Sequence, residues 1–297
     1  MFDLIRVAEH TYYVNCPVRV GLWEKDGDAI LIDSGNTPET AARILDRVTE
    51  AGFRVRHVLN THCHPDHIGG NRYIAEKTGA TCWCSSKDAA FCTVSELGTA
   101  IMYGGRPPQK LMRDRFMKAE DWPAREAEEF PFPEGMELIP LEGHSMFQKG
   151  VRTPDGVCFM ADCVASTRVL DRFVFTYAYD IGLYRGTLER LCGWDKGIYI
   201  PSHCEPTEDI ASLAAENLQR LDARLAELTE LLRNAMTFEE LLTELFHRHK
   251  LRMTLSQRYL IGSTVSGMLS YLMDMGLVDA RPDNGSLVWL STEGNRK

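Results

Sequence analysis

Four side chains of metal-ligating types fall within six residues of one another in the segment THCHPDH, residues 61–67. His62 and His64 are two positions apart at the end of a predicted strand, so both imidazoles project to the same side and can bind one cation. Pro65 favours a turn, which places Asp66 and His67 near a helix start, directed toward a second position. Imidazole and carboxylate ligands suit zinc, and also iron or manganese. The segment therefore predicts a metal site.

Four ligands of this kind do not complete two metal sites, so further ligands must come from later in the chain. Three candidates each follow an apolar run and precede a turn: His144 in LEGHS, Asp162 in FMADC and His203 in IPSHCEP. Loops that follow the strands of one sheet meet at one rim, and we expect these three side chains to gather there with the first four.

These residues, in this order, and the upstream segment LIDSG with Asp33 resemble the metallo-β-lactamase-fold hydrolase superfamily over about residues 1–207. The resemblance implies an α/β fold, a four-layer αββα sandwich with a two-metal site on one edge. It implies one cation on His62, His64 and His144, a second on Asp66, His67 and His203, and Asp162 bridging the two. Asp33 would orient the ligands from behind.

The chemistry expected of such a site is metal-dependent hydrolysis. Two divalent cations, expected to be zinc with iron or manganese as alternatives, can share a hydroxide that attacks a carbonyl or phosphorus. Asp66 is the candidate to orient this nucleophile or to carry a proton. We expect a small-molecule ester, thioester, lactone or lactam as substrate. Cys163 follows Asp162 where glyoxalase II enzymes have a different pattern, which disfavours a glutathione thioester.

Two other activities are compatible with the same residues. A metal-dependent nuclease would use the C-terminal part of the chain to hold RNA or DNA, and a mono-iron oxygenase would bind a single iron through two histidines and one aspartate. The number and identity of the bound metals separate the oxygenase from the hydrolases. Salt-sensitive RNA binding would favour the nuclease.

The elements that must position these residues alternate between strands and helices. Short strand runs at residues 11–34 are separated by a hairpin signal at 25–28, a helix is predicted over 38–51, and a strand over 55–60 leads into the histidine cluster. Further strands are expected at 136–141, 157–161 and 198–201. Alternation of this kind predicts α/β layering.

Residues 92–130 interrupt this pattern and are rich in Met, Arg and Pro. They are interpreted either as an insertion lying over the site or as a helical decoration. Three tyrosines, Tyr103, Tyr177 and Tyr179, are candidates to line a pocket, although packing in the core is favoured for them.

From residue 208 the pattern becomes helical, and a separate unit is predicted over 208–297, after a catalytic domain over 1–207. A long amphipathic helix is expected over 210–233, and Thr237 with Glu240 resembles a capping box that opens a second helix. Two more helical segments, near 255–261 and 265–275, precede a hairpin with its turn at 282–285. From residue 237 on, three helices are thus followed by a hairpin, which is the layout of a winged-helix unit. Its basic stretch, residues 246–258, could contact nucleic acid, but packing or pocket closure is favoured.

The composition excludes several classes of protein. The 297 residues carry 33 Lys and Arg against 42 Asp and Glu, a formal net charge of −9, which argues against strong unspecific binding of polyanions. No transmembrane run is present, and Asp3, Arg6 and Glu9 stand where a signal peptide would be apolar. The nine cysteines are expected to be free thiols. These features predict a cytoplasmic protein without membrane contact, and a homodimer is compatible with them.

Overall fold

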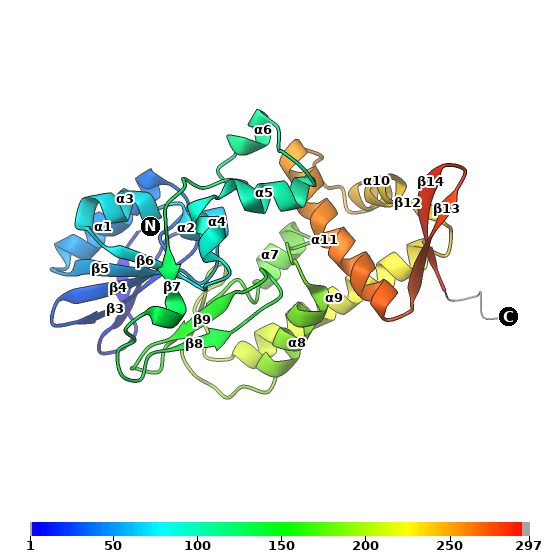
Figure 1. The fold of residues 1–297 in the computed structure, drawn as a ribbon. Coiled ribbons are helices and arrows are strands. Elements are labelled where there is room, and N and C mark those ends of the chain that lie inside the picture. The colour runs from blue at the N-terminus through cyan, green and yellow to red at the C-terminus, as the bar shows by residue number, and fades with distance from the viewer. Residues whose placement is uncertain (1, 293–297) are drawn as a thin grey trace.

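The computed structural model describes residues 2–292, which form two sheets packed face to face and a third, smaller sheet near the C-terminus (Figure 1). The larger sheet has the order β1-β2-β3-β4-β5-β6-β7. Its strands are β1 (Leu4–Arg6), β2 (Thr11–Val14), β3 (Val20–Lys25), β4 (Asp28–Ile32), β5 (Arg54–Leu59), β6 (Thr81–Cys84) and β7 (Arg125–Glu126). The second sheet has the order β11-β10-β9-β8 and consists of β8 (Glu137–Pro140), β9 (Lys149–Arg152), β10 (Cys158–Ala161) and β11 (Tyr199–Pro201).

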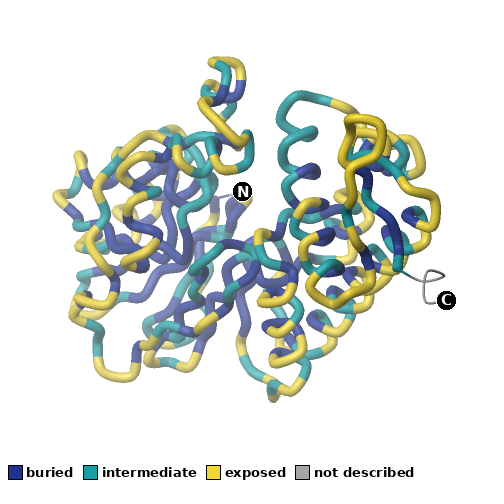
Figure 2. Tube along the Cα trace, turned by 45° about the vertical axis from the view of Figure 1, so that its right-hand side comes forward, coloured by how far each residue is buried: buried dark blue, intermediate teal, exposed yellow. Residues whose placement is uncertain are grey.

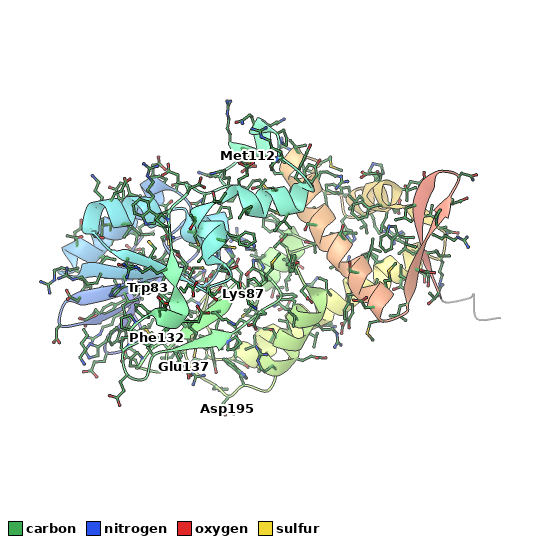
Figure 3. All side chains as sticks on the ribbon, viewed as in Figure 1. Trp83, Lys87, Met112, Phe132, Glu137 and Asp195 are labelled. Carbon is green, nitrogen blue, oxygen red and sulfur yellow. The ribbon has the colours of Figure 1, made fainter. Side chains whose placement is uncertain are left out.

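The side chains of β4 show how four layers arise. Ala29 and Leu31 face the helices α1 (Pro38–Glu50) and α3 (Asn71–Thr78), whereas Ile30 and Ile32 face the second sheet. This alternation follows from the two-residue period of a strand that is buried on both faces. Trp83 and Phe132 belong to the same middle core as Ile30 (Figure 3).

The outer face of the second sheet is covered by α8 (Ile181–Leu191). Met160 of β10 packs in one cluster with Ile181 and Leu188 of this helix. The order of layers is therefore helix, sheet, sheet, helix, which confirms the expected αββα sandwich. Figure 2 shows buried chain running through the centre of the molecule, with exposed turns on the outside.

Local sequence signals account for several elements. The turn between β3 and β4 has Asp26 and Gly27 at positive φ, as a two-residue hairpin requires, and α1 begins where Thr37 accepts a hydrogen bond from the backbone N–H of Thr40. Gly21 of β3 is required because a Cβ there would lie 2.5 Å from the ring of Phe159 on the facing sheet.

The strand ends gather at one edge of the sandwich. β4 and β5 run parallel in the large sheet, and β10 and β11 run parallel in the small one. The loops after these four strands carry Asp33, the cluster at residues 61–67, Asp162 and His203. The second half of this cluster lies in the short helix α2 (Pro65–Ile68), which carries Asp66 and His67, and α3 follows it. The edge that the sequence predicts as a metal site is therefore built from strand ends of both sheets.

The segment 92–130 begins within the short helix α4 (Ala89–Thr93) and continues through α5 (Glu96–Tyr103), α6 (Gln109–Met112) and the 3₁₀ turn η1 (Ala127–Glu129), beside this edge. α5 lies against α11 (Leu255–Asp274), where the rings of Tyr103 and Tyr259 are 4.8 Å apart (Figure 1). The insertion is therefore attached to the C-terminal helices as well as to the sandwich.

The remaining helices are α7 (Thr167–Arg172), α9 (Ile210–Leu231) and α10 (Phe238–Arg248). The capping box of Thr237 and Glu240 is confirmed at the start of α10. The expectation of two separate helical segments near 255–261 and 265–275 is wrong, because α11 is one continuous helix. Gly262 is tolerated because it lies at a buried position inside this long helix.

A third sheet has the strand order β12-β14-β13. It consists of β12 (Met236–Thr237), β13 (Val278–Asp283) and β14 (Ser286–Ser291). The winged-helix assignment stays a prediction, as does the division at residue 207. One hydrophobic cluster contains Met160, Leu188, Leu228 and Leu269, so the core continues across residue 207. Within the described residues, no helix is both long and apolar enough to cross a membrane.

Candidate metal centre

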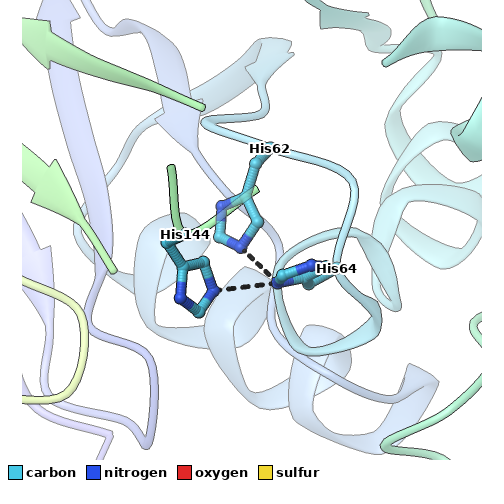
Figure 4. Close-up of side chains that lie close together, drawn as sticks. All are labelled: His62, His64 and His144. Carbon is cyan, nitrogen blue, oxygen red and sulfur yellow. Dashed lines mark hydrogen bonds between the residues drawn. The ribbon is translucent and has the colours of Figure 1, made fainter. Parts of the chain in front are cut away.

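Three imidazoles converge at the edge of the sandwich (Figure 4). The Nδ1 atom of His64 lies 3.0 Å from Nε2 of His62 and 3.0 Å from Nε2 of His144. His144 comes from the loop after β8, about eighty positions along the chain from the other two. The structure thus brings together the first three predicted ligands.

Four further side chains form a second cluster beside the first. Ligand atoms of Asp66, His67, Asp162 and His203 lie within 4.8 Å of one another. Nε2 of His203 is 3.1 Å from Oδ2 of Asp162, and Nε2 of His144 in the first cluster is 3.5 Å from the same oxygen. Asp162 therefore stands between the two clusters, where the sequence analysis expected a bridging residue. The role of these seven residues as ligands stays a prediction.

Asp33 orients ligands of both clusters from behind. Its Oδ2 accepts hydrogen bonds from Nδ1 of His67 at 2.8 Å and from the hydroxyl of Thr61 at 2.9 Å. That hydroxyl in turn lies 3.0 Å from Nδ1 of His62. Because the Thr61 proton is directed to Asp33, its oxygen accepts the Nδ1 proton of His62, and the lone pair at Nε2 of His62 is left facing the cluster. Sequence reasoning missed Thr61, although it directly precedes the first histidine.

The backbone holds His144 in the same manner. Its Nδ1 donates to the carbonyl oxygen of Tyr177 at 2.9 Å, so Nε2 keeps its lone pair for the cluster. Gly143 has a φ of +120°, and a Cβ there would lie 2.1 Å from the backbone nitrogen of Tyr184. Only glycine permits this close approach of the loop to α8.

The arrangement fits cations better than hydrogen bonds. In the first cluster, ring nitrogens with lone pairs face each other at 3.0 Å. In the second, Nε2 of His67 and Oδ1 of Asp162 are buried and lack a hydrogen-bond partner, although they lie 3.2 Å apart. Buried polar groups without partners are costly, and a divalent cation satisfies both sets of lone pairs at once.

The family model of the metallo-beta-lactamase superfamily matches residues 14–203. The chain belongs to this superfamily. A beta-lactamase domain protein from Burkholderia ambifaria has the same fold, with a TM-score of 0.75 and 20% identity over 98% of this chain and 94% of that chain. The likeness extends beyond the residues that the family model matches, into the C-terminal helices. The expected family and fold class are confirmed.

Curated relatives match this superfamily member over shorter stretches. A hydroxyacylglutathione hydrolase from Methylococcus capsulatus is 46% identical over 44 residues, which are 15% of this chain and 17% of the relative. Hydroxyacylglutathione hydrolase GloC from Haemophilus influenzae is 26% identical over 106 residues, 36% of this chain and 47% of the relative. The chain thus matches less than half the length of each of these relatives. Together with the His and Asp clusters, the superfamily indicates divalent metal binding.

The first cluster is neutral at physiological pH. Burial, reinforced by neighbouring imidazoles, lowers the pKa of His62 well below its ordinary value and lowers that of His64 to about 3. Burial also lowers the pKa of His144. Neutral imidazole is the form that binds metals. Three candidate ligands of this superfamily member are therefore already in the metal-binding form, and no proton has to leave them when a cation binds.

In the second cluster, the two histidines keep their protons at neutral pH. Burial alone would lower the pKa of His203, but the carboxylates of Asp162 and Asp66 outweigh it and raise the pKa to about 10. Burial opposes them at His67 too, yet Asp162 and Asp33 raise its pKa well above the ordinary value. A cation must displace these protons in order to bind.

Loading the protein with zinc at pH 6 is therefore expected to release about two protons per chain, from His67 and His203. The measurement is titration calorimetry in buffers of different ionisation enthalpy; pH 6 is chosen because water on such a cation ionises at about pH 7. Affinity at the second cluster should rise with pH up to the pKa of His203, about 10. Loading without proton release at pH 6 would contradict this electrostatic description.

The remaining residues highlighted by the sequence analysis lie outside the clusters. All nine cysteines are free thiols. Cys163 and Cys204 are buried in packing roles, and Cys63 donates to Oδ1 of Asp88 at 3.4 Å. In the basic stretch 246–258, Arg248 pairs with Glu244 and Arg258 pairs with Glu239. Carboxylates therefore neutralise two of its four cationic side chains, which weakens its suitability for phosphate contacts.

Proposed function

We propose that this chain is a binuclear, zinc-type hydrolase that acts on a small-molecule ester, thioester, lactone or lactam. The observation that carries the proposal is the convergence of five imidazoles and two carboxylates from residues 62–203 at one edge of the sandwich. This donor set, with a carboxylate between two clusters, suits a pair of divalent cations. When bound, such cations generate a nucleophile from water at neutral pH and polarise a substrate oxygen.

The protein's own groups then have distinct tasks. His62, His64 and His144 would hold one cation, and hydrogen bonds at Nδ1 of His62 and of His144 have already oriented the Nε2 lone pairs of these two rings. In the second cluster, Oδ2 of Asp66 lies 3.4 Å from Nε2 of His203, on the side of the cluster that is partly exposed. This position supports assigning to Asp66 the task of orienting a water molecule and carrying its proton toward a leaving group.

The free state of the cysteines supports a proposal about the cellular compartment. Nine free cysteines, seven of them buried, are typical of a protein kept in a reducing environment. We therefore propose the cytoplasm as the site of action, with a small-molecule substrate and no requirement for nucleic acid.

The test is a substrate panel with the zinc-loaded protein: thioesters including a glutathione thioester, lactones, lactams, phosphodiesters and RNA. We expect turnover of at least one carbonyl substrate, and Asp66→Ala should reduce kcat/KM by about 10²-fold or more. Asp46→Ala, which removes an exposed carboxylate on α1, is the matched control and should leave the rate unchanged.

Three outcomes would overturn the proposal. Cleavage of RNA alone would identify a nuclease. One tightly bound iron per chain would indicate oxygen chemistry. Equal turnover by the parent and by Asp66→Ala on every substrate would place the reaction outside the cluster.

A further inference from the structure

A narrow pocket opens beside His64 in the first cluster. Its walls are mainly apolar and are formed by Phe91, Ile101, Met102, Met117, Met146 and Tyr179. Within the described residues, no lysine or arginine lines it. The helices α4 and α5 of the insertion supply one wall, and the segment before α8 supplies Tyr177, whose ring lies 5.2 Å from that of His64.

The pocket adjoins the first cluster and not the second. His64 lines it, together with Ser145, the neighbour of His144. None of the four side chains of the second cluster lines it. A bond held between the two clusters would therefore leave one side of the substrate in the pocket and the other side over the second cluster, near Asp66.

The size of the pocket limits what it can hold. The cavity volume is about 50 Å³. On the scale of a cavity of about 150 Å³, which holds a benzene ring, this volume holds roughly two carbon atoms, so the further carbon atoms of a short chain lie along the mouth. Ile101 of α5 is 48% exposed, and Tyr179 in the segment before α8 is 41% exposed, so two separate segments contribute exposed apolar surface to the rim of the pocket.

Charge also limits the occupant. Asp88 lines the inner part of the pocket but is only 1% exposed, and its Oδ2 is covered and lacks a hydrogen-bond partner. A ligand therefore touches apolar walls and does not reach the carboxylate. At low local dielectric the covered charge repels an anionic chain. It attracts an ammonium group, but no ligand atom reaches the carboxylate, and the neutral hydroxyls in the lining, such as that of Ser145, replace only part of the hydration that an ammonium group loses.

We propose that this pocket binds a short, uncharged, apolar acyl group of about three to five carbon atoms beyond the reacting carbonyl. The proposal rests on the proposed function and adds the substrate class. The acyl side is assigned to the pocket because Asp66, the group able to carry a proton to a leaving group, lies in the other cluster. Three methionine walls, Met102, Met117 and Met146, suit an alkyl chain because thioether side chains adapt to its shape.

The test is a series of thioesters that share one leaving thiol and differ in the acyl group: acetyl, butyryl, hexanoyl and decanoyl, with succinyl and 4-aminobutyryl as charged members. Each methylene that enters the pocket should raise kcat/KM about fourfold, until the pocket is full near hexanoyl. Succinyl and 4-aminobutyryl should react at least tenfold more slowly than butyryl. Preference for either charged group, or equal rates along the uncharged series, would overturn the proposal.

Variants that make the side chain at position 102 smaller or larger test the same pocket. Met102→Ala removes three non-hydrogen atoms from a wall and should extend the rise in kcat/KM by two or three carbon atoms. Met102→Trp should slow hexanoyl at least tenfold and leave acetyl nearly unchanged. Met275→Ala, an exposed methionine after α11, is the matched control. A uniform loss across all chain lengths in both Met102 variants would contradict the assignment.

Binding without hydrolysis separates this proposal from the proposed function. Methyl ketones carry the carbonyl and the chain but no hydrolysable bond. Saturation-transfer NMR on the metal-free protein should detect binding of 2-heptanone. This binding signal should be lost in Met102→Trp. Ketone binding with no turnover of any ester would support the pocket and refute the hydrolase, whereas turnover that is insensitive to chain length, without ketone binding, would refute the pocket alone.

Discussion

Replacing Asp162 by alanine is expected to lower kcat/KM by about 10³-fold or more and to reduce bound metal from about two cations per chain to about one. Asp162 stands between the clusters, with Oδ2 at 3.1 Å from His203 and 3.5 Å from His144. Burial favours its neutral form, but His203 and His67 outweigh this and hold the pKa well below the ordinary value, so the side chain is a carboxylate at neutral pH. Its removal deprives both clusters of the carboxylate that stands between them.

The checks for Asp162→Ala are metal analysis and steady-state kinetics on whichever substrate the panel identifies. Asp171→Ala removes an exposed carboxylate from α7 and serves as the matched control, since it breaks only a surface ion pair with Arg220. Circular dichroism should show the same secondary structure in both variants. A full complement of metal and an unchanged rate in Asp162→Ala would disprove its bridging role.

Replacing Asn217 by alanine is expected to lower the free energy of unfolding by about 2–4 kcal/mol. Asn217 is a buried residue of α9, and its side chain accepts from the backbone nitrogen of Ala165 at 2.9 Å and donates to the backbone oxygen of the same residue at 2.8 Å. Without the amide, both backbone groups would stay buried and unpaired. Ala165 lies three residues after Asp162, so metal affinity should fall about tenfold as well.

Urea denaturation of the metal-free and loaded protein measures this effect. Asn217→Asp keeps the acceptor and loses the amide donor, so it should retain the bond to the nitrogen of Ala165 and lose the one to its oxygen. Asn234→Ala, at an exposed position after α9, is the control and should change stability by less than about 0.5 kcal/mol. A similarly small change in Asn217→Ala would show that α9 does not support the Asp162 loop.

Sequence patterns identified the site because its signals are local. His62 and His64 share a side through the two-residue period of an extended chain, and Pro65 starts the turn that presents Asp66 and His67. The capping box at Thr237 and the hairpin turn at Asp26 are local in the same sense, since backbone geometry over three or four residues decides them. The family resemblance then supplied the order of the distant ligands.

Other features could not be read from neighbouring residues. The bond from Asn217 to Ala165 spans 52 positions, and the contact between the tilted rings of Tyr103 and Tyr259 joins the insertion to α11. The role of residues 92–130 was left open for the same reason, and the structure places part of this segment in the wall of the pocket. A continuous α11 was missed because Gly262 weakens the helical pattern locally, while burial of the helix compensates for it.

The sequence by itself determined which residue types are available for metal chemistry and where strands and helices begin, because both depend on short-range spacing and backbone preference. Only the tertiary structure decided that the Thr61 hydroxyl connects Asp33 to His62, that Asp88 is covered among the apolar residues lining the pocket, and that this pocket adjoins one cluster rather than both. Such relations arise when two sheets and their helices pack into one core. That packing depends on contacts between residues far apart in the chain, which no local pattern encodes.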